Sequence, residues 1–136
     1  QYPDTGLILF GGSMGTTAAL KMATEHDEEA VIVMGSFSSV ADVIQGMYPI
    51  IPVELLLKDQ LCNSDMVHKV NSPIMIIHGA LDRLIDVKYA RKLYNGALQP
   101  KHFVLMDRAG HNDLFSYDAK DHILYFLNEH LQHKDQ

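Results

Sequence analysis

The chain has 136 residues, the size of about one domain, and its apolar fraction of 47% is ordinary for a globular protein. Its formal net charge of -6, from 17 acidic and 11 basic residues, argues against a nucleic-acid partner, because no basic stripe is present to neutralise phosphates. One cysteine excludes an intrachain disulfide, and no apolar run approaches the roughly 18 residues of a membrane-spanning helix. The chain opens without a signal peptide or an initiator Met, so we expect an N-terminal part to be absent.

Short apolar runs alternate with amphipathic segments of helix length, a pattern typical of an α/β layer fold. The runs that we predict to be buried strands are residues 7–10, 30–34, 73–78 and 103–106. Helices are predicted over residues 14–24, 87–98 and 119–131, with two short helices within 39–57, broken at Pro49 and Pro52. Four strands joined by helices imply a parallel sheet with right-handed crossovers. Reactive groups in such sheets gather at the carboxyl ends of the strands.

The first predicted strand runs into Gly11-Gly12-Ser13-Met14-Gly15, a G-x-S-x-G sequence. This pattern places a serine on a strained turn between strand and helix, with small neighbours two residues away so that the backbones can pass. The turn exposes the hydroxyl, and the helix N-terminus favours developing negative charge. The Met14 N–H is the expected oxyanion donor. The alternatives are a structural turn or a phosphate-binding loop, although the G-K-[ST] ending and the G-x-G-x-x-G spacing of such loops are both missing.

A carboxylate follows the third predicted strand, at the end of the sequence HGALD. Held just beyond a buried strand, the carboxylate of Asp82 can orient an imidazole and stabilise its charged form. A purely structural role is the alternative, because turns favour aspartate in general. Asp86 competes for the same role, but it directly precedes Val87 and is well placed to cap the next helix.

Of the eight histidines, His111 is the one in a glycine-containing loop that follows a buried strand in the C-terminal third of the chain. Its sequence, AGHND, follows the fourth predicted strand, so Ser13, Asp82 and His111 each follow a strand of their own. Solvated positions on helix faces or in the tail are predicted for His26, His122, His130 and His133. Positions in connections are predicted for His68 and His102, and a packed, hydrogen-bonded core position for His78.

Several of these stretches resemble α/β-hydrolases. LILFGGSMGTTAALKMA is similar to the nucleophile turn of that superfamily, AVIVMGSFSSVADVI to the next strand and loop, and PIMIIHGALDRLIDV and AGHND to the acid and base loops. The order Ser, Asp, His is the one these enzymes use. SFSSV and GHND further resemble the membrane-associated α/β-hydrolase-domain proteins that include protein depalmitoylases and lysophospholipid lipases. Prolyl-oligopeptidase-like hydrolases share much of the pattern.

The resemblance implies a three-layer α/β/α fold with a mostly parallel sheet, in which residues 1–136 form a partial domain, the last four strands and their helices. It implies Ser13 as nucleophile, Asp82 as acid, His111 as base and the backbone N–H of Met14 as one oxyanion donor. The family's second oxyanion donor and N-terminal membrane segment have no counterpart here. Neither a metal nor an organic cofactor is implied, and a cytoplasmic or membrane-associated location is favoured.

The implied reaction is hydrolysis of an acyl ester or thioester through an acyl-enzyme. A prolyl-oligopeptidase-type peptidase and a non-catalytic interaction module are the alternatives. The expected partners are a small-molecule acyl substrate and either the absent N-terminal half or a second chain paired at the edge of the first strand. A lid would be inserted within residues 37–72. This segment is short, so an open site is expected. Its apolar side chains are expected to line an acyl pocket or, for most of them, to pack in the core: Phe37, Val40, Met47, Tyr48, Ile50, Ile51 and Leu55.

Overall fold

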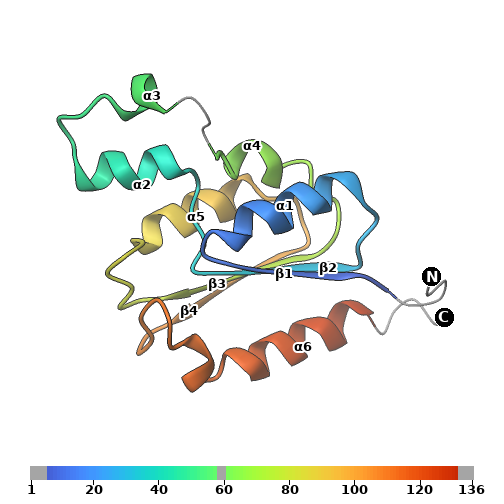
Figure 1. Cartoon of the computed structure of the whole chain (residues 1–136). Coiled ribbons are helices and arrows are strands. Elements are labelled where there is room, and N and C mark those ends of the chain that lie inside the picture. The colour runs from blue at the N-terminus through green and yellow to red at the C-terminus, as the bar shows by residue number, and fades with distance from the viewer. Residues whose placement is uncertain (1–5, 58–60, 132–136) are drawn as a thin grey trace.

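A computed structural model describes residues 6–57 and 61–131 of the chain (Figure 1). Its four strands form one parallel sheet in the order β1-β2-β3-β4. The strands are β1 Ile8–Gly12, β2 Ala30–Met34, β3 Ile74–Gly79 and β4 Lys101–Met106. The helical elements are α1 Gly15–Glu25, α2 Val40–Met47, α3 Val53–Leu56, α4 Ser64–Val67, α5 Val87–Gly96, the 3-10 helix η1 Leu114–Ser116 and α6 Ala119–Leu131.

Helices cover both faces of the sheet, and this gives the three layers that the sequence predicts. Figure 1 shows α1, α4 and α5 above the strands and α6 below them. The fully buried strand β2 contributes alternate side chains to the two sides. Val31 and Val33 pack among α1, α4 and α5, whereas Ile32 and Met34 pack towards Phe126 of α6. Each fully buried Val or Ile side chain stabilises the fold by about 1.5–3 kcal/mol, so this continuous apolar run determines the central strand.

The observed elements differ from the predicted ones mainly where the sequence is polar or the element is short. Strand β4 begins at Lys101, two residues before the apolar run, because the parallel ladder pairs Lys101 with Ile74 and His102 with Met75. His102 therefore lies in a strand, and its predicted position in a connection was wrong. Helix α4 and η1 were not predicted, because elements of 4 and 3 residues are too short to show a helical period.

Helices α2 and α3 stand away from the sheet at one end of the molecule (Figure 1). Ser39 caps α2 by accepting a hydrogen bond from the Asp42 N–H, and Lys92 of α5 contacts the Asp42 carboxylate at 2.8 Å. The core packing predicted for most apolar residues of this segment was wrong, since Ile50 is 96% and Leu55 86% exposed. Met47, Tyr48 and Ile51 are exposed as well. Within the described residues, no helix is both long enough and apolar enough to span a membrane.

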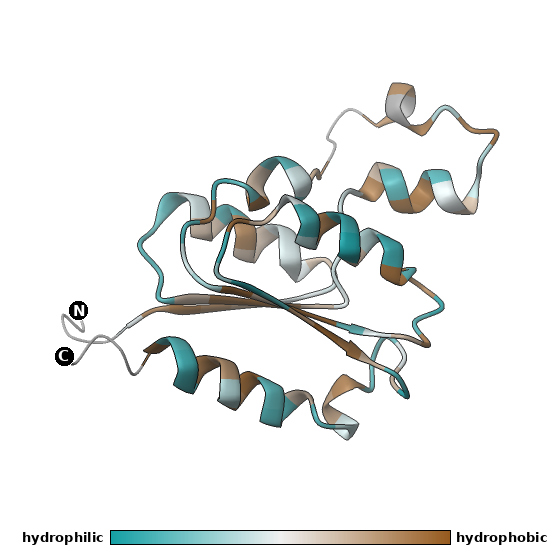
Figure 2. Ribbon diagram, turned by 180° about the vertical axis from the view of Figure 1, so that it is seen from behind, coloured by the Kyte–Doolittle hydropathy of each residue, from teal (hydrophilic) through white to brown (hydrophobic). Residues whose placement is uncertain are grey.

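Strand β1 lies at an edge of the sheet. Its Leu9 side chain is buried beneath α1, whereas Ile8 and Phe10 project from the opposite face, where they are 38% and 51% exposed. Helix α6 packs on β2 and β3, and the Phe115 ring of η1 stacks on the Phe10 ring at a centroid distance of 6.2 Å. The strands of the sheet are largely apolar, as their brown colour in Figure 2 shows. The edge therefore combines open backbone hydrogen-bonding groups with apolar side chains.

We expect the 136-residue chain to self-associate through β1, because an exposed apolar edge strand is a template for pairing with another strand. Ile8→Lys places a charge on this edge and should shift the chain towards monomer, measured by size-exclusion chromatography with light scattering. Leu124→Lys on exposed α6 is the matched control and should leave association unchanged. A monodisperse monomer of the unsubstituted chain at micromolar concentration would contradict this expectation.

Candidate active site

Ser13 occupies the turn between β1 and α1 in a strained backbone conformation. Its φ of 50° is in the left-handed region, which a non-glycine residue adopts at a cost of about 1–3 kcal/mol. The Ser13 N–H donates a 2.8 Å hydrogen bond to the Met34 carbonyl at the end of β2, and the Ser13 carbonyl accepts from Thr16 in the first turn of α1. These contacts hold the turn in place at the carboxyl edge of the sheet. Strain of this kind clusters at functional sites.

The two outer glycines of the G-x-S-x-G sequence differ in how much space they have. A Cβ at Gly11 would lie 2.5 Å from the Gly15 carbonyl oxygen and 2.9 Å from the Ala19 Cβ, so the close crossing of β1 and α1 requires glycine there. A Cβ at Gly15 would meet nothing within 4 Å. The expectation that both positions must be small is therefore correct for Gly11 and wrong for Gly15.

Asp82 is fixed by hydrogen bonds in the loop after β3. Its side chain is fully buried, and its Oδ1 accepts from the N–H groups of Leu84 at 2.9 Å and Ile85 at 2.8 Å. Its other oxygen, Oδ2, lies 2.6 Å from His111 Nδ1. The competing residue, Asp86, instead caps α5 by accepting from the Lys88 N–H. The geometry thus separates the two candidates as the sequence predicts.

His111 lies between Asp82 and Ser13. Its Nε2 is 3.1 Å from Ser13 Oγ, and its side chain is 11% exposed. The carboxylate oxygen is the acceptor of this hydrogen bond, so Nδ1 carries the proton and its N–H donates to Asp82. The Nε2 lone pair is then left to accept a hydrogen bond from the Ser13 hydroxyl. The structure thus brings the three predicted site residues, which come from three separate loops, into one chain of contacts. In this arrangement His111 can take a proton from Ser13.

His78 contacts the same carboxylate from the core side. It is fully buried, its Nε2–H donates a 2.8 Å hydrogen bond to the Ile85 carbonyl, and Nε2 is 3.4 Å from Asp82 Oδ2. Burial lowers the pKa of His78, so its ring is neutral near pH 7 and the approach to Asp82 is not an ion pair. Among the described residues, its Nδ1 has no hydrogen-bond partner. The core position predicted for His78 is confirmed, but its contact with the acid loop was not predicted.

Gly35, directly after β2, is a position that the sequence analysis did not single out. Its φ is 56°, and a Cβ there would lie 3.0 Å from Cε1 of His111. The glycine therefore supplies both a left-handed turn and the space for the imidazole. A glycine at the end of a predicted strand is the only sequence signal that pointed to it.

The Met14 N–H lies at the N-terminus of α1, beside Ser13. Met14 is the N-cap residue of the helix, so its N–H is one of the groups that the helix itself leaves without a partner. The helix dipole adds a partial positive charge at this end. An oxygen that becomes negative next to Ser13 would be stabilised here.

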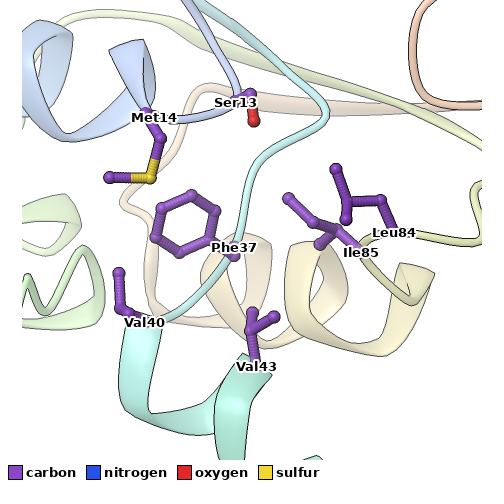
Figure 3. Close-up of a pocket in the computed structure, with 7 residues that line it drawn as sticks. All are labelled: Ser13, Met14, Phe37, Val40, Val43, Leu84 and Ile85. Atoms are coloured by element: carbon purple, nitrogen blue, oxygen red, sulfur yellow. The ribbon is translucent and has the colours of Figure 1, made fainter. Parts of the chain in front are cut away.

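Two cavities flank Ser13. The first, of about 200 Å³, is lined by Ser13 and by six apolar residues that surround the space it faces (Figure 3): Met14, Phe37, Val40, Val43, Leu84 and Ile85. Of the predicted acyl-pocket residues, only Phe37 and Val40 line it. The second cavity, of about 310 Å³, lies towards β1 and includes Phe10, His111 and Phe115. The first cavity can hold a hydrocarbon chain. The second cavity can hold another part of the same molecule on the other side of Ser13.

The remaining histidines lie away from this site. His26, His68 and His122 are exposed, and His133 lies outside the described residues. The prediction that His130 is solvated was wrong, because its side chain is only 15% exposed and its Nε2 lies 2.9 Å from Nε2 of His102.

Comparison with known proteins places these observations in a family. No protein-family model matches the chain. The chain is 30% identical over 126 residues to an uncharacterized protein of Mycobacterium tuberculosis, covering 90% of this chain and 45% of that protein. It is also 30% identical over 113 residues to alpha/beta hydrolase domain-containing protein 17B of Homo sapiens, covering 82% of this chain and 37% of that protein. The chain belongs to the α/β-hydrolase superfamily.

The solved structures agree with this α/β-hydrolase assignment. An esterase of Pyrococcus furiosus matches with a TM-score of 0.74 at 19% identity, over 96% of this chain and 56% of that chain. The described strands and helices correspond to the C-terminal half of the α/β-hydrolase fold, as predicted. The chain spans less than half the length of the two curated relatives.

Gly35→Ala in this α/β-hydrolase chain should cost about 1–3 kcal/mol of stability, because alanine strains the positive φ, and the added methyl should displace His111 from Ser13. Urea unfolding measures the first effect, and the rate at which Ser13 reacts with a fluorophosphonate measures the second. Gly15→Ala is the control, since its methyl enters open space. Equal stability and reactivity in both variants would show that Gly35 is not required.

The lowered pKa of His78 predicts a pH dependence of stability. Below about pH 6.5 the unfolded chain protonates this histidine while the folded chain does not, so stability is lost as the pH falls from about 6.5 towards the lower folded-state pKa. Above about pH 6.5, His78 makes no contribution to the change of stability with pH. His78→Gln should therefore lose less stability than the unsubstituted chain between about pH 7.5 and pH 5, measured by urea unfolding. His122→Gln, at an exposed histidine, should show the same change of stability with pH as the unsubstituted chain. If His78→Gln shows that same change, the lowered pKa of His78 does not cause the pH dependence.

Proposed function

We propose that this chain carries the nucleophile, base and acid of a serine hydrolase that cleaves an acyl ester or thioester. The observation that carries the proposal is the chain of contacts from Ser13 Oγ through the His111 ring to the buried Asp82 carboxylate, at 3.1 and 2.6 Å. Membership of the α/β-hydrolase superfamily supports a hydrolase activity. The strained turn at Ser13 is the nucleophile elbow in this proposal.

The proposed reaction has two stages. His111 Nε2 takes the Ser13 proton while Oγ attacks the carbonyl carbon, and the tetrahedral intermediate then expels the alcohol or thiol, which leaves with the proton from His111. In the second stage His111 takes a proton from water, the hydroxide attacks the acyl carbon, and Ser13 recovers its proton as the carboxylic acid is released.

Asp82 stabilises the imidazolium that forms in both stages. Its two hydrogen bonds from backbone N–H groups hold the carboxylate in place and prevent it from rotating. It holds the His111 ring in the tautomer whose Nε2 faces Ser13.

The oxyanion of the intermediate is assigned to the Met14 N–H at the start of α1. In the superfamily pattern a second N–H comes from a loop that has no counterpart in residues 1–136. We propose that a further strand pairs with the open edge of β1 and brings this donor, supplied by the hydrolase's other half. Removing one oxyanion donor costs about 10²–10³ in kcat, so we expect slow turnover by the 136-residue chain alone.

The apolar cavity beside Ser13 indicates an acyl chain as the part of the substrate that stays attached to the serine. Apart from Ser13, its lining consists of hydrocarbon side chains and the Met14 thioether. The sequence resemblance to the branch that includes depalmitoylases and lysophospholipid lipases favours the same class of substrate. The leaving alcohol or thiol is assigned to the cavity on the β1 side.

Labelling with a fluorophosphonate tests the proposal, because the reagent forms a covalent bond only with an activated serine. We expect the label on the Ser13 peptide by mass spectrometry, none in Ser13→Ala, and unchanged labelling in Ser116→Ala, at an exposed serine. Asp82→Asn should slow ester hydrolysis about 10⁴-fold. Retention of most activity by Ser13→Ala would place the nucleophile elsewhere.

A substrate panel distinguishes the remaining alternatives. Acyl p-nitrophenyl esters and acyl thioesters should be cleaved, and prolyl amides should not. The opposite preference would indicate a prolyl-oligopeptidase-type peptidase. Absence of labelling in a folded chain would indicate a non-catalytic interaction module.

A further inference from the structure

Three side chains of residue types that can bind metal ions lie together at the end of the molecule where β4 begins, whereas the Ser13 site lies where the strands end. His102 is the second residue of β4, and Glu129 and His130 belong to the last turn of α6. The two histidine Nε2 atoms are 2.9 Å apart, and Glu129 Oε2 is 4.0 Å from each of them. All three ligand atoms lie within 4.8 Å of one another. The proposed hydrolase mechanism uses none of these residues.

The spacing suits one divalent transition-metal ion. Imidazole nitrogen binds Zn²⁺ at about 2.0–2.1 Å and a carboxylate oxygen at about 2.0–2.2 Å. Two nitrogens at that distance from one ion are about 2.9 Å apart when they subtend a right angle and about 3.4 Å apart in a tetrahedron. The histidines therefore need to separate by only about 0.5 Å. The Glu129 oxygen must move closer by a similar distance, and its half-exposed side chain has room to do so.

The two imidazole rings are held in position by packing. Both rings contact the fully buried ring of Phe126 edge to face, His102 at a centroid distance of 5.2 Å and His130 at 4.8 Å. The packing against Phe126, together with the hydrogen bond between the two Nε2 atoms, orients the rings so that these atoms point towards each other. Pre-organised ligands lower the ordering cost of binding.

The surrounding charge favours a cation. His130 lines a cavity of about 320 Å³ with Asp27, Glu28 and Glu29. Within the described part of the chain, Glu28 Oε2 is buried without a hydrogen-bond partner, which leaves an uncompensated acceptor in this cavity. These groups raise the local concentration of cations.

We propose that His102, His130 and Glu129 bind one zinc-class divalent ion, which ties the C-terminal end of α6 to the start of β4. Three protein ligands leave a fourth position for water. Binding requires both Nε2 atoms to be unprotonated, so the proton they share is displaced as the ion enters. The site stabilises the fold from the opposite end of the sheet and takes no part in hydrolysis.

Calorimetric titration of the EDTA-treated, dialysed 136-residue chain with zinc chloride tests the proposal. We expect one ion per chain and a rise in melting temperature, because a ligand that binds the folded state stabilises it. His102→Gln and His130→Gln should each weaken zinc binding at least tenfold. His122→Gln, an exposed histidine on the same helix, and His111→Gln, in the proposed active site, should bind as the unsubstituted chain does. Magnesium should not bind, because it prefers an all-oxygen site.

Two results would overturn the proposal. One is unchanged zinc affinity in both His102→Gln and His130→Gln, and the other is no zinc binding by the folded, unsubstituted chain. If a variant does not fold, the visible absorption of Co²⁺ added to the unsubstituted chain still decides the question. Bound cobalt with nitrogen ligands gives an intense d–d spectrum that zinc abolishes by competition, whereas a spectrum of hydrated cobalt rejects the site.

Discussion

The Asp82 carboxylate is fully buried, and a buried charge is tolerated only when hydrogen bonds replace its lost hydration. One oxygen accepts from two N–H groups of its own loop, and the other accepts from His111. Further hydrogen bonds hold the two loops: Leu81 donates to the Ala109 carbonyl of the other loop, and Gly110 donates to Asp113 within its own loop. Together with the contacts of Asp82, they set the loop geometry at the carboxyl edge. Ser13 then needs only to project from its own strand to complete the contacts.

The sheet brings these loops together because all its strands run in the same direction. Strands β2 and β3 are buried on both faces, so their apolar runs were visible in the sequence and their register follows from packing. The residues after β1, β3 and β4 then meet at one edge without any local signal that joins them. This is why Ser13, Asp82 and His111 could be selected from the sequence by their places after predicted strands. Their mutual distances could not be predicted.

The features that the sequence did not reveal depend on tertiary contacts between distant segments. Gly35 resembles any glycine at a strand end until the His111 ring is placed against it, and His78 resembles a core residue until Asp82 lies beside it. The pairing of His102 with His130 joins a strand to a helix 28 residues later. In the α2–α3 segment, apolar residues suggested burial because composition does not tell whether a covering surface exists. The exposure of Ile50 and Leu55 shows that no such surface covers them among the described residues.

The position of Ser13 between two separate cavities has a consequence for the order of events under the proposed mechanism. The two parts of a substrate would lie on opposite sides of the serine, so the first product can leave without disturbing the part that stays bound. The space it vacates adjoins His111 and is the space that water must enter for the second stage. Product release and water entry would therefore use one route in succession, and the retained acyl group would leave by another. An enzyme built in this way turns over by a ping-pong sequence, and an alcohol that occupies the vacated cavity would compete with water for the same acyl group.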